Sequence, residues 1–172
     1  SRVFQTPEIF ADLSVMDNVL IPCFAKRDGA FKMHGIESVS SEKQLIEQAE
    51  QMLAEVKMLD KRNMIASSMS RGDKRRLEMA MCLVQEPRLL LLDEPTAGMA
   101  RADTENTIQL LKDIRTQRGI TMAIIEHDMN VVFSLADRIT VLAQGTPLVE
   151  DTPDKIKNHP KVREAYLGEA QV

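Results

Sequence analysis

The chain has 172 residues and a formal net charge of −4, with 44% hydrophobic and 28% charged residues. This apolar content excludes a disordered chain, and the slight acidity argues against a nucleic-acid binder, which normally carries a basic excess. With one Tyr, five Phe and no Trp, an aromatic platform for single strands is not expected. No apolar run approaches the roughly 20 residues that cross a bilayer. Cys23 and Cys82 have no disulfide or metal-ligand pattern, so we expect two reduced core thiols in a cytoplasmic protein.

The first half of the sequence is typical of helices and loops. Segment 13–23 alternates irregularly between helical and loop signals, and segment 26–41, with two glycines and several charges, predicts an exposed, mobile connection. From Ser41, which we expect to be the helix cap, apolar residues follow helical spacing. The members of this apolar face are Leu45, Ile46, Ala49, Met52, Leu53 and Val56.

The second half alternates strands and helices. Residues 89–92 are four consecutive leucines, which predict a strand buried on both faces of a parallel sheet. The other expected strands are 121–125 and 139–143, the expected helices are 102–117 and 129–136, and two short helices open at Pro153 and Pro160. This alternation predicts an α/β fold with a parallel sheet and helices. Ligands of such sheets bind at the carboxyl ends of the strands, so Asp93–Glu94 and Glu126–His127 should lie on the same rim of the sheet.

Asp93 and Glu94 are the first candidate site residues. An apolar strand that delivers two adjacent carboxylates to a sheet edge suits metal-assisted phosphoryl transfer. One carboxylate holds Mg²⁺, directly or through water, and its neighbour deprotonates the attacking water. The alternative is an ordinary strand that ends in solvent with acidic residues.

The second candidate is the sequence Ser70-Arg71-Gly72-Asp73, which precedes a helix expected over about 74–84. Ser70 is a good N-cap, and Asp73 completes a pattern like a capping box. Free amides at a helix start, with Gly72 allowing close approach, also suit a phosphate. The alternative is a simple capped helix, and the cluster 74–76 is more typical of a solvated helix face.

Two other residues carry little information alone. His127 follows the second strand and is able to hydrogen-bond a phosphate, but a structural histidine is the alternative. Gln5 is uninformative by itself.

Read in order, these motifs resemble the nucleotide-binding domain of ABC transporters. They correspond to its Q-loop (2–5), signature motif (70–73), Walker B strand with the catalytic glutamate (89–95), D-loop (97–99) and switch histidine (125–128). Finer details are similar to the ATP-binding subunits of branched-chain amino-acid importers and their relatives. These details are the segments 4–7, 75–78, 126–129, 136–139 and 160–169.

The resemblance implies a P-loop NTPase-like fold and a role for each residue. Asp93 would hold Mg²⁺ and Glu94 would be the general base, with His127 at the γ-phosphate. Gln5 would contact Mg²⁺ and the attacking water. The signature residues Ser70, Arg71, Gly72 and Asp73 would touch ATP held by a second subunit, and Gly98 of the D-loop joins the nucleotide-binding set. Arg71, Asp73 and, in the D-loop, Ala100 depart from the family's usual residues.

The resemblance also implies that one element is missing. None of the seven glycines precedes a lysine, so no Walker A loop of the form G-x-x-x-x-G-K-[ST] is present. We therefore expect a C-terminal fragment that lacks the N-terminal part of the fold and that binds and hydrolyses ATP poorly. Loss of a central strand should expose strand edges and apolar surface, which favours self-association.

The organisation implied is a Q-loop and helical subdomain over 1–86 and a Walker B and switch-histidine part of the core over 87–172. The function implied is that of the ATPase subunit of an importer for branched-chain amino acids or similar solutes. Its cofactors would be ATP and Mg²⁺, and its partners membrane permeases and a second ATP-binding subunit, identical or not. It would lie at the inner face of the plasma membrane. The alternatives are a soluble ABC ATPase acting on DNA or ribosomes and a non-catalytic interaction module.

Overall fold

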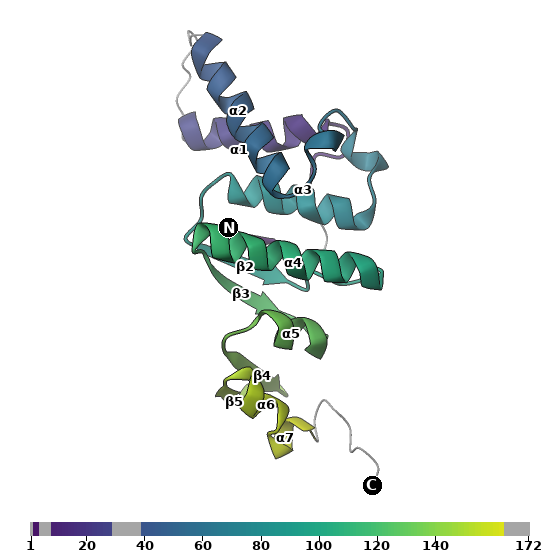
Figure 1. The fold of residues 1–172 in the computed structure, drawn as a ribbon, viewed down its shortest axis with the longest axis vertical. Helices are drawn as coiled ribbons and strands as arrows, with labels where there is room; N and C mark the ends of the chain where they lie inside the picture. The colour runs from purple at the N-terminus through teal and green to yellow at the C-terminus, as the bar shows by residue number, and fades with distance from the viewer. Residues whose placement is uncertain (1, 4–7, 29–38, 164–172) are drawn as a thin grey trace. The chain divides into compact units, whose positions relative to one another are not determined.

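The computed structural model describes residues 2–3, 8–28 and 39–163. The chain divides into two compact units, 1–126 and 127–172, and each is described by itself. In the first unit three helices, α1, α2 and α3, gather at one end, with α3 lying between the α1–α2 pair and α4 (Figure 1). The helices of this unit are α1 (Val15–Asp28), α2 (Val39–Glu55), α3 (Arg71–Leu83) and α4 (Arg101–Arg118).

The helical end of the first unit packs around apolar positions at helical spacing. Leu45, Ala49, Met52 and Leu53 of α2 are buried as predicted, whereas Ile46 is 43% exposed. The apolar side chains that α1 and α3 contribute to the buried set are Val15, Val19, Cys23, Leu77, Met79, Ala80 and Leu83.

Two expectations for this region are wrong in detail. Residues 15–28 form a helix, so the helical signals of 13–23 prevail over its loop signals, and this helix includes positions 26–28 of the expected connection. Helix α2 begins at Val39, so Ser41 lies inside it and is not its cap. Positions 39–41 of the expected connection belong to α2, and positions 29–38 lie outside the described residues.

The first unit contains a three-stranded parallel sheet in the order β1-β2-β3. Strand β2 is central, and its register pairs Leu91 with Ala123 on β3 and with Arg2 on β1. The strands are β1 (Arg2–Val3), β2 (Leu89–Asp93) and β3 (Thr121–Ile125). Because all three strands run in one direction, Asp93 and Ile125 end at the same edge of the sheet.

The prediction that β2 is buried on both faces is wrong. Leu90 and Leu92 are buried, but Leu89 is 44% exposed and Leu91 39% exposed. On β3, Ile125 is 66% exposed. Successive strand residues point to opposite faces, so one face of this sheet is apolar and is left uncovered by the described residues of the first unit. Leu89, Leu91 and Ile125 thus contribute apolar surface that is exposed, as expected from the sequence.

The second unit contains a two-stranded antiparallel sheet rather than a third parallel strand. Strand β4 covers the predicted range 139–143, but it pairs with β5 through a turn that contains Gly145 at φ +77°. Ile139, Val141, Ile156 and Val162 form the small core of this unit. Its elements are α5 (Met129–Leu135), β4 (Ile139–Ala143), β5 (Thr146–Asp151), α6 (Pro153–Lys157) and α7 (Pro160–Val162). Helices α6 and α7 begin at the predicted prolines.

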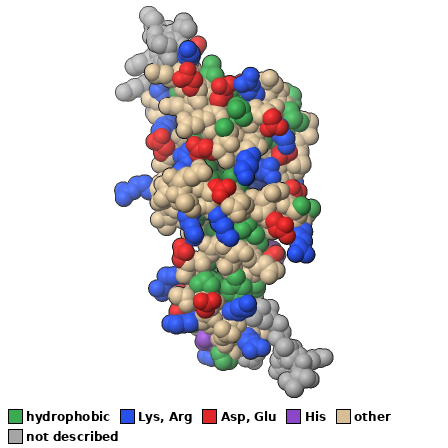
Figure 2. All heavy atoms as spheres, in the orientation of Figure 1, with side chains coloured by type: hydrophobic (Ala, Val, Ile, Leu, Met, Phe, Trp, Pro, Cys, Tyr) green, Lys and Arg blue, Asp and Glu red, His purple; other side chains and the backbone are tan. Residues whose placement is uncertain are grey.

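The expected end of the helix at Gly119 is confirmed. Helix α4 ends at Gly119, which has a left-handed φ of +59°. Both cysteines are free; Cys23 is buried as expected of a core thiol, whereas Cys82 is only half-buried. None of the helices in the described ranges is long and apolar enough to cross a membrane. Acidic and basic side chains are interspersed on the face of the molecule shown in Figure 2.

Candidate nucleotide site

The end of β2 carries Asp93 and Glu94 into a tight turn. Both residues are half-buried. Glu94 has φ +44°, in the left-handed region that non-glycine residues rarely adopt. Its amide donates to the carbonyl of Ile125 at 2.9 Å, and its carbonyl accepts from the amide of Ala97 at 3.1 Å. The neighbouring strand and the following residues therefore define the backbone conformation of Glu94.

Thr96 anchors the other side of this turn. Its amide and its hydroxyl both donate to Oε1 of Glu126, at 3.0 and 2.6 Å. The second oxygen of Glu126, Oε2, is buried and accepts no hydrogen bond among the described residues. Glu126 directly follows β3, so the turn after β2 is tied to the end of the adjacent strand.

The turn is also bound to helix α3 through Arg75, whose side chain is 3% exposed. Its guanidinium donates from Nη2 to the carbonyls of Asp93, at 2.9 Å, and Glu94, at 3.0 Å. Nε donates to the carbonyl of Pro95 at 3.4 Å, and Nη1 pairs with Oε2 of Glu78 at 2.8 Å. The interpretation of cluster 74–76 as a solvated face is thus wrong for Arg75.

Arg75 was not predicted as a site residue, although the sequence contains a signal for it. Its helical neighbours Gly72 and Met79, three and four positions away, are buried, and Glu78 lies one turn on with the opposite charge. A charged pair on the apolar face of a helix indicates a buried structural contact. Sequence alone could not say which group that contact would meet.

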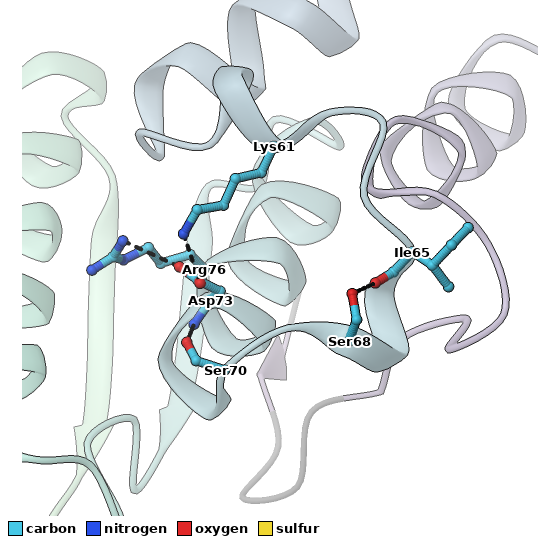
Figure 3. A network of polar contacts seen from close by, with 6 residues as sticks. All are labelled: Lys61, Ile65, Ser68, Ser70, Asp73 and Arg76. Atoms are coloured by element: carbon cyan, nitrogen blue, oxygen red, sulfur yellow. Dashed lines mark hydrogen bonds and ion pairs between the residues drawn. The ribbon is translucent and has the colours of Figure 1, made fainter.

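Ser70 is the N-cap of α3, as predicted, and its hydroxyl accepts from the amide of Asp73 at 3.2 Å. Figure 3 shows Lys61 reaching the Asp73 carboxylate, with Nζ 2.7 Å from Oδ2. Arg76 lies on the other side of Asp73, 3.5 Å from Oδ1. Partial burial opposes ionisation of Asp73, but hydrogen bonds from Lys61 and Ser70 and the charges of Lys61 and Arg76 outweigh it and lower the pKa of this carboxyl.

Ser70 and Arg71 are exposed at the start of α3, whereas Gly72 is buried. A Cβ built on Gly72 would lie 3.6 Å from Cγ of Asp103 on α4, in ordinary contact. Gly98 has φ +67°, and a Cβ there would lie 2.5 Å from Nη1 of Arg71. The predicted signature and D-loop segments are therefore neighbours within the first unit.

His127 is the first residue of the second unit and is exposed. Asp128 caps α5 by accepting from the amide of Asn130 at 2.9 Å. Gln5 lies outside the described residues, so its assignment stays a prediction. In the part of the chain that the structure describes, no three His, Cys, Asp or Glu side chains group as metal ligands.

Cys82, on α3, is not a nucleophile candidate. Burial, together with the charge of Glu78, raises the pKa of its thiol to about 11. The thiol therefore remains protonated at neutral pH.

The donors present fit part of a magnesium–nucleotide site. A carboxylate at the end of β2 is the hard oxygen ligand that Mg²⁺ prefers. The amides at the start of α3 suit an anion, with exposed Ser70 beside them. The lysine-bearing loop that cradles β- and γ-phosphates in P-loop proteins is not among these 172 residues.

Comparison with known proteins decides the family. A model of the ABC transporter family matches residues 1–97. A model described as a branched-chain amino acid ATP-binding cassette transporter matches residues 147–172. The chain belongs to the ABC transporter ATP-binding proteins, of the branched-chain amino acid type.

Individual relatives agree with this assignment. The high-affinity branched-chain amino acid transport ATP-binding protein LivG of Escherichia coli K12 is 37% identical over 98% of this chain and 68% of its own length. The ADP conformation of MJ1267, an ATP-binding cassette of an ABC transporter, matches with TM-score 0.78 and 26% identity, over 98% of this chain and 68% of that one. A dimeric post-hydrolysis state of the cassette MJ0796 with ADP and Pi matches with TM-score 0.69 and 26% identity, over 88% and 62%.

Proposed function

We propose that this chain works within an ATP-hydrolysing subunit that drives import of branched-chain amino acids or similar small solutes. The observation that supports this most is the match of residues 147–172 to the branched-chain amino acid type, at the opposite end of the chain from the 1–97 match. A site built around Asp93 and Glu94 is consistent with it. The relatives act as transport proteins, which disfavours the alternative of an ATPase on DNA or ribosomes.

In this proposal, the candidate site residues have different roles in ATP hydrolysis. The Asp93 carboxylate would hold Mg²⁺, directly or through water, and the metal would stabilise charge on the phosphates. Glu94 would accept the proton of the attacking water, with His127 and Gln5 assisting at the γ-phosphate. Gly98 would stay close to Arg71, supporting the cross-subunit contact.

The start of α3 would serve a second ATP molecule. Ser70, Arg71, Gly72 and Asp73 would approach the γ-phosphate of ATP held by a partner ATP-binding subunit, identical or not. The dimeric state of the MJ0796 cassette with ADP and Pi supports this arrangement. The helical end around α1 and α2 would dock on a membrane permease, which would place the protein at the cytoplasmic face of the membrane.

Transport is tested with the subunit as its gene encodes it, assembled with its permeases in membrane vesicles. Magnesium-dependent ATP hydrolysis coupled to uptake of labelled leucine, isoleucine or valine is the expected result. Hydrolysis with uptake of another solute class would contradict the substrate assignment, and absence of hydrolysis would contradict the function.

For the 172 residues alone we propose a non-catalytic state that binds ATP weakly. The absence of a glycine followed by lysine removes the main phosphate cradle, and the uncovered face of β2 and β3 favours self-association. Calorimetry should give no micromolar affinity for ATP, and light scattering should give a mass above that of one chain. Micromolar binding or a clean monomer would contradict the respective part of this proposal.

A further inference from the structure

Arg75 joins the two candidate halves of the nucleotide site. It lies one turn into α3, after the exposed start at Ser70, and its buried guanidinium reaches three consecutive carbonyls, those of Asp93, Glu94 and Pro95. Helix α3 therefore begins with the proposed contact to one ATP molecule, and it also hydrogen-bonds, through Arg75, to the turn that contains the proposed base for hydrolysis of a second ATP molecule.

The hydrogen bonds between residue 75 and the β2 turn require an arginine side chain and could not be made by a lysine. A guanidinium is planar, with its N–H donors in a fixed fork, and here Nε, Nη1 and Nη2 are all engaged. A lysine ammonium has all its N–H donors on one nitrogen atom, so it cannot bind three carbonyls and a carboxylate at once. Glu78, with a side chain only 4% exposed, supplies the opposite charge that makes burial of the guanidinium tolerable.

The turn needs such a restraint because its backbone is strained at Glu94. A left-handed conformation costs a non-glycine residue about 1–2 kcal/mol. Residues in such conformations persist where the surroundings over-determine them. At Glu94 three hydrogen bonds provide these surroundings. The Glu94 amide donates to the carbonyl of Ile125 at 2.9 Å, and the Glu94 carbonyl accepts from the amide of Ala97 at 3.1 Å and from Nη2 of Arg75 at 3.0 Å.

We propose that Arg75 is a positioning residue for ATP hydrolysis, an inference that rests on the proposed function. Its guanidinium holds the Asp93–Pro95 backbone so that the Glu94 carboxylate keeps the direction needed to deprotonate water. Because Arg75 belongs to α3, this direction is coupled to the helix whose first turn carries Ser70 and Gly72. Glu78 fixes the guanidinium in place.

The test compares Arg75→Lys with Arg118→Lys in the gene-encoded subunit assembled with its permeases. Arg118 is the control because its Nε and Nη2 donate to Glu55 in a partly buried pair that joins the end of α4 to the end of α2, away from the β2 turn. Arg75→Lys should lower kcat by roughly 10- to 100-fold, since small misplacement of a catalytic group has effects of this order. KM for ATP should stay within about twofold, as should both constants in Arg118→Lys.

A double-mutant cycle separates positioning from simple loss of folded protein. In a Glu94→Gln background, Arg75→Lys should change the residual rate by less than about twofold, because Arg75 acts through the missing carboxylate. A full multiplicative loss in that background would overturn the proposal, as would wild-type kcat in the single variant.

Amide hydrogen exchange gives a readout that does not depend on activity. In Arg75→Lys the amides of Glu94 and Ala97 should exchange faster, on the order of tenfold, relative to Arg118→Lys. Unchanged exchange would overturn the role of Arg75. Faster exchange in a protein whose wild type hydrolyses no ATP would instead overturn the proposed function and leave the restraint of the turn standing.

Discussion

The turn after β2 and the start of α3 are the two candidate nucleotide contacts, and they are built in opposite ways. The turn contains a left-handed glutamate and is fixed by hydrogen bonds that it accepts from Arg75 of α3 and donates to Ile125 of β3 and to Glu126. The start of α3 is a relaxed helix N-terminus with one side-chain cap, and Ser70 and Arg71 are exposed.

This difference matches what each region is proposed to do. A general base acts on a water molecule within hydrogen-bond reach, so its direction must be set in advance. A contact to ATP on another subunit must form and break as subunits approach and separate, so an exposed helix start suits it. Changes at the turn should therefore have larger effects than changes at the helix start.

The largest effect is expected for Glu94→Gln in the gene-encoded subunit. Loss of the proposed base should lower ATP turnover by on the order of 10²–10⁴-fold, in a steady-state phosphate-release assay. Glu105→Gln, which removes a charge from an exposed pair with Arg101 on α4, is the control and should retain turnover. Full activity in Glu94→Gln would remove Glu94 from its role.

Arg75→Ala should cause the largest loss of stability. It takes the guanidinium away from the buried Glu78 carboxylate and from the carbonyls of Asp93, Glu94 and Pro95, which should lower the free energy of unfolding by about 3–5 kcal/mol in urea titrations. Arg118→Ala breaks a more exposed pair and should cost about 1 kcal/mol or less. Equal losses of unfolding free energy in the two variants would show that the burial of Arg75 does not make its ion pair more important for stability.

Gly98→Ala should destabilise the loop beside Arg71. The left-handed φ of +67° costs alanine about 1–2 kcal/mol. The approach of 2.5 Å to Nη1 adds little, because that atom is the end of a flexible side chain. Gly119→Ala is the matched control, with φ +59° and open space around it. Thermal melts should show similar losses in both, and a much larger loss at Gly98 would mean that Arg71 is held rigidly.

Ser70→Ala should lower the free energy of unfolding by about 1 kcal/mol, the usual effect of losing an N-cap. Ser70→Asp keeps a capping oxygen and should restore most of that stability. If Ser70→Ala were neutral, the 3.2 Å bond to the Asp73 amide would have no energetic role.

The smallest effect concerns pH. The pKa of Asp73 is lowered in the folded chain, so its contribution to stability is present above the ordinary carboxyl range, near pH 4, and is lost as pH falls through the lowered value. Asp73→Asn should therefore flatten the fall in unfolding free energy below about pH 4. An unchanged slope in acid titrations would contradict the pairing with Lys61 and Arg76.

Local patterns were sufficient to predict much of this fold. The spacing of Leu45, Ala49 and Leu53 predicted α2, the four leucines predicted β2, and Gly119 marked the end of α4. These features depend on periodicity and on backbone preferences that neighbouring residues determine. The ordered motifs predicted the family, which the comparisons show.

The rest depended on contacts distant in sequence. Leu91 is apolar whether or not another layer covers it, so its exposure was not predictable from the run of leucines. Strand β4 has the same apolar pattern whether it joins a parallel sheet or a hairpin with β5. Arg75 meets carbonyls 18 to 20 residues away, which no local pattern encodes. The roles of Gln5, His127 and the other site residues stay predictions, as does a subdomain boundary at 86/87.

The most direct test is an experimental structure of the gene-encoded subunit carrying Glu94→Gln, crystallised with ATP and Mg²⁺. The Asp93 carboxylate should contact the metal, directly or through one water, with residue 94 facing the γ-phosphate. Ser70 Oγ and the Gly72 amide should contact the γ-phosphate of ATP held by the second subunit. A nucleotide bound away from the end of β2, with Asp93 and residue 94 facing solvent, would contradict the central claim.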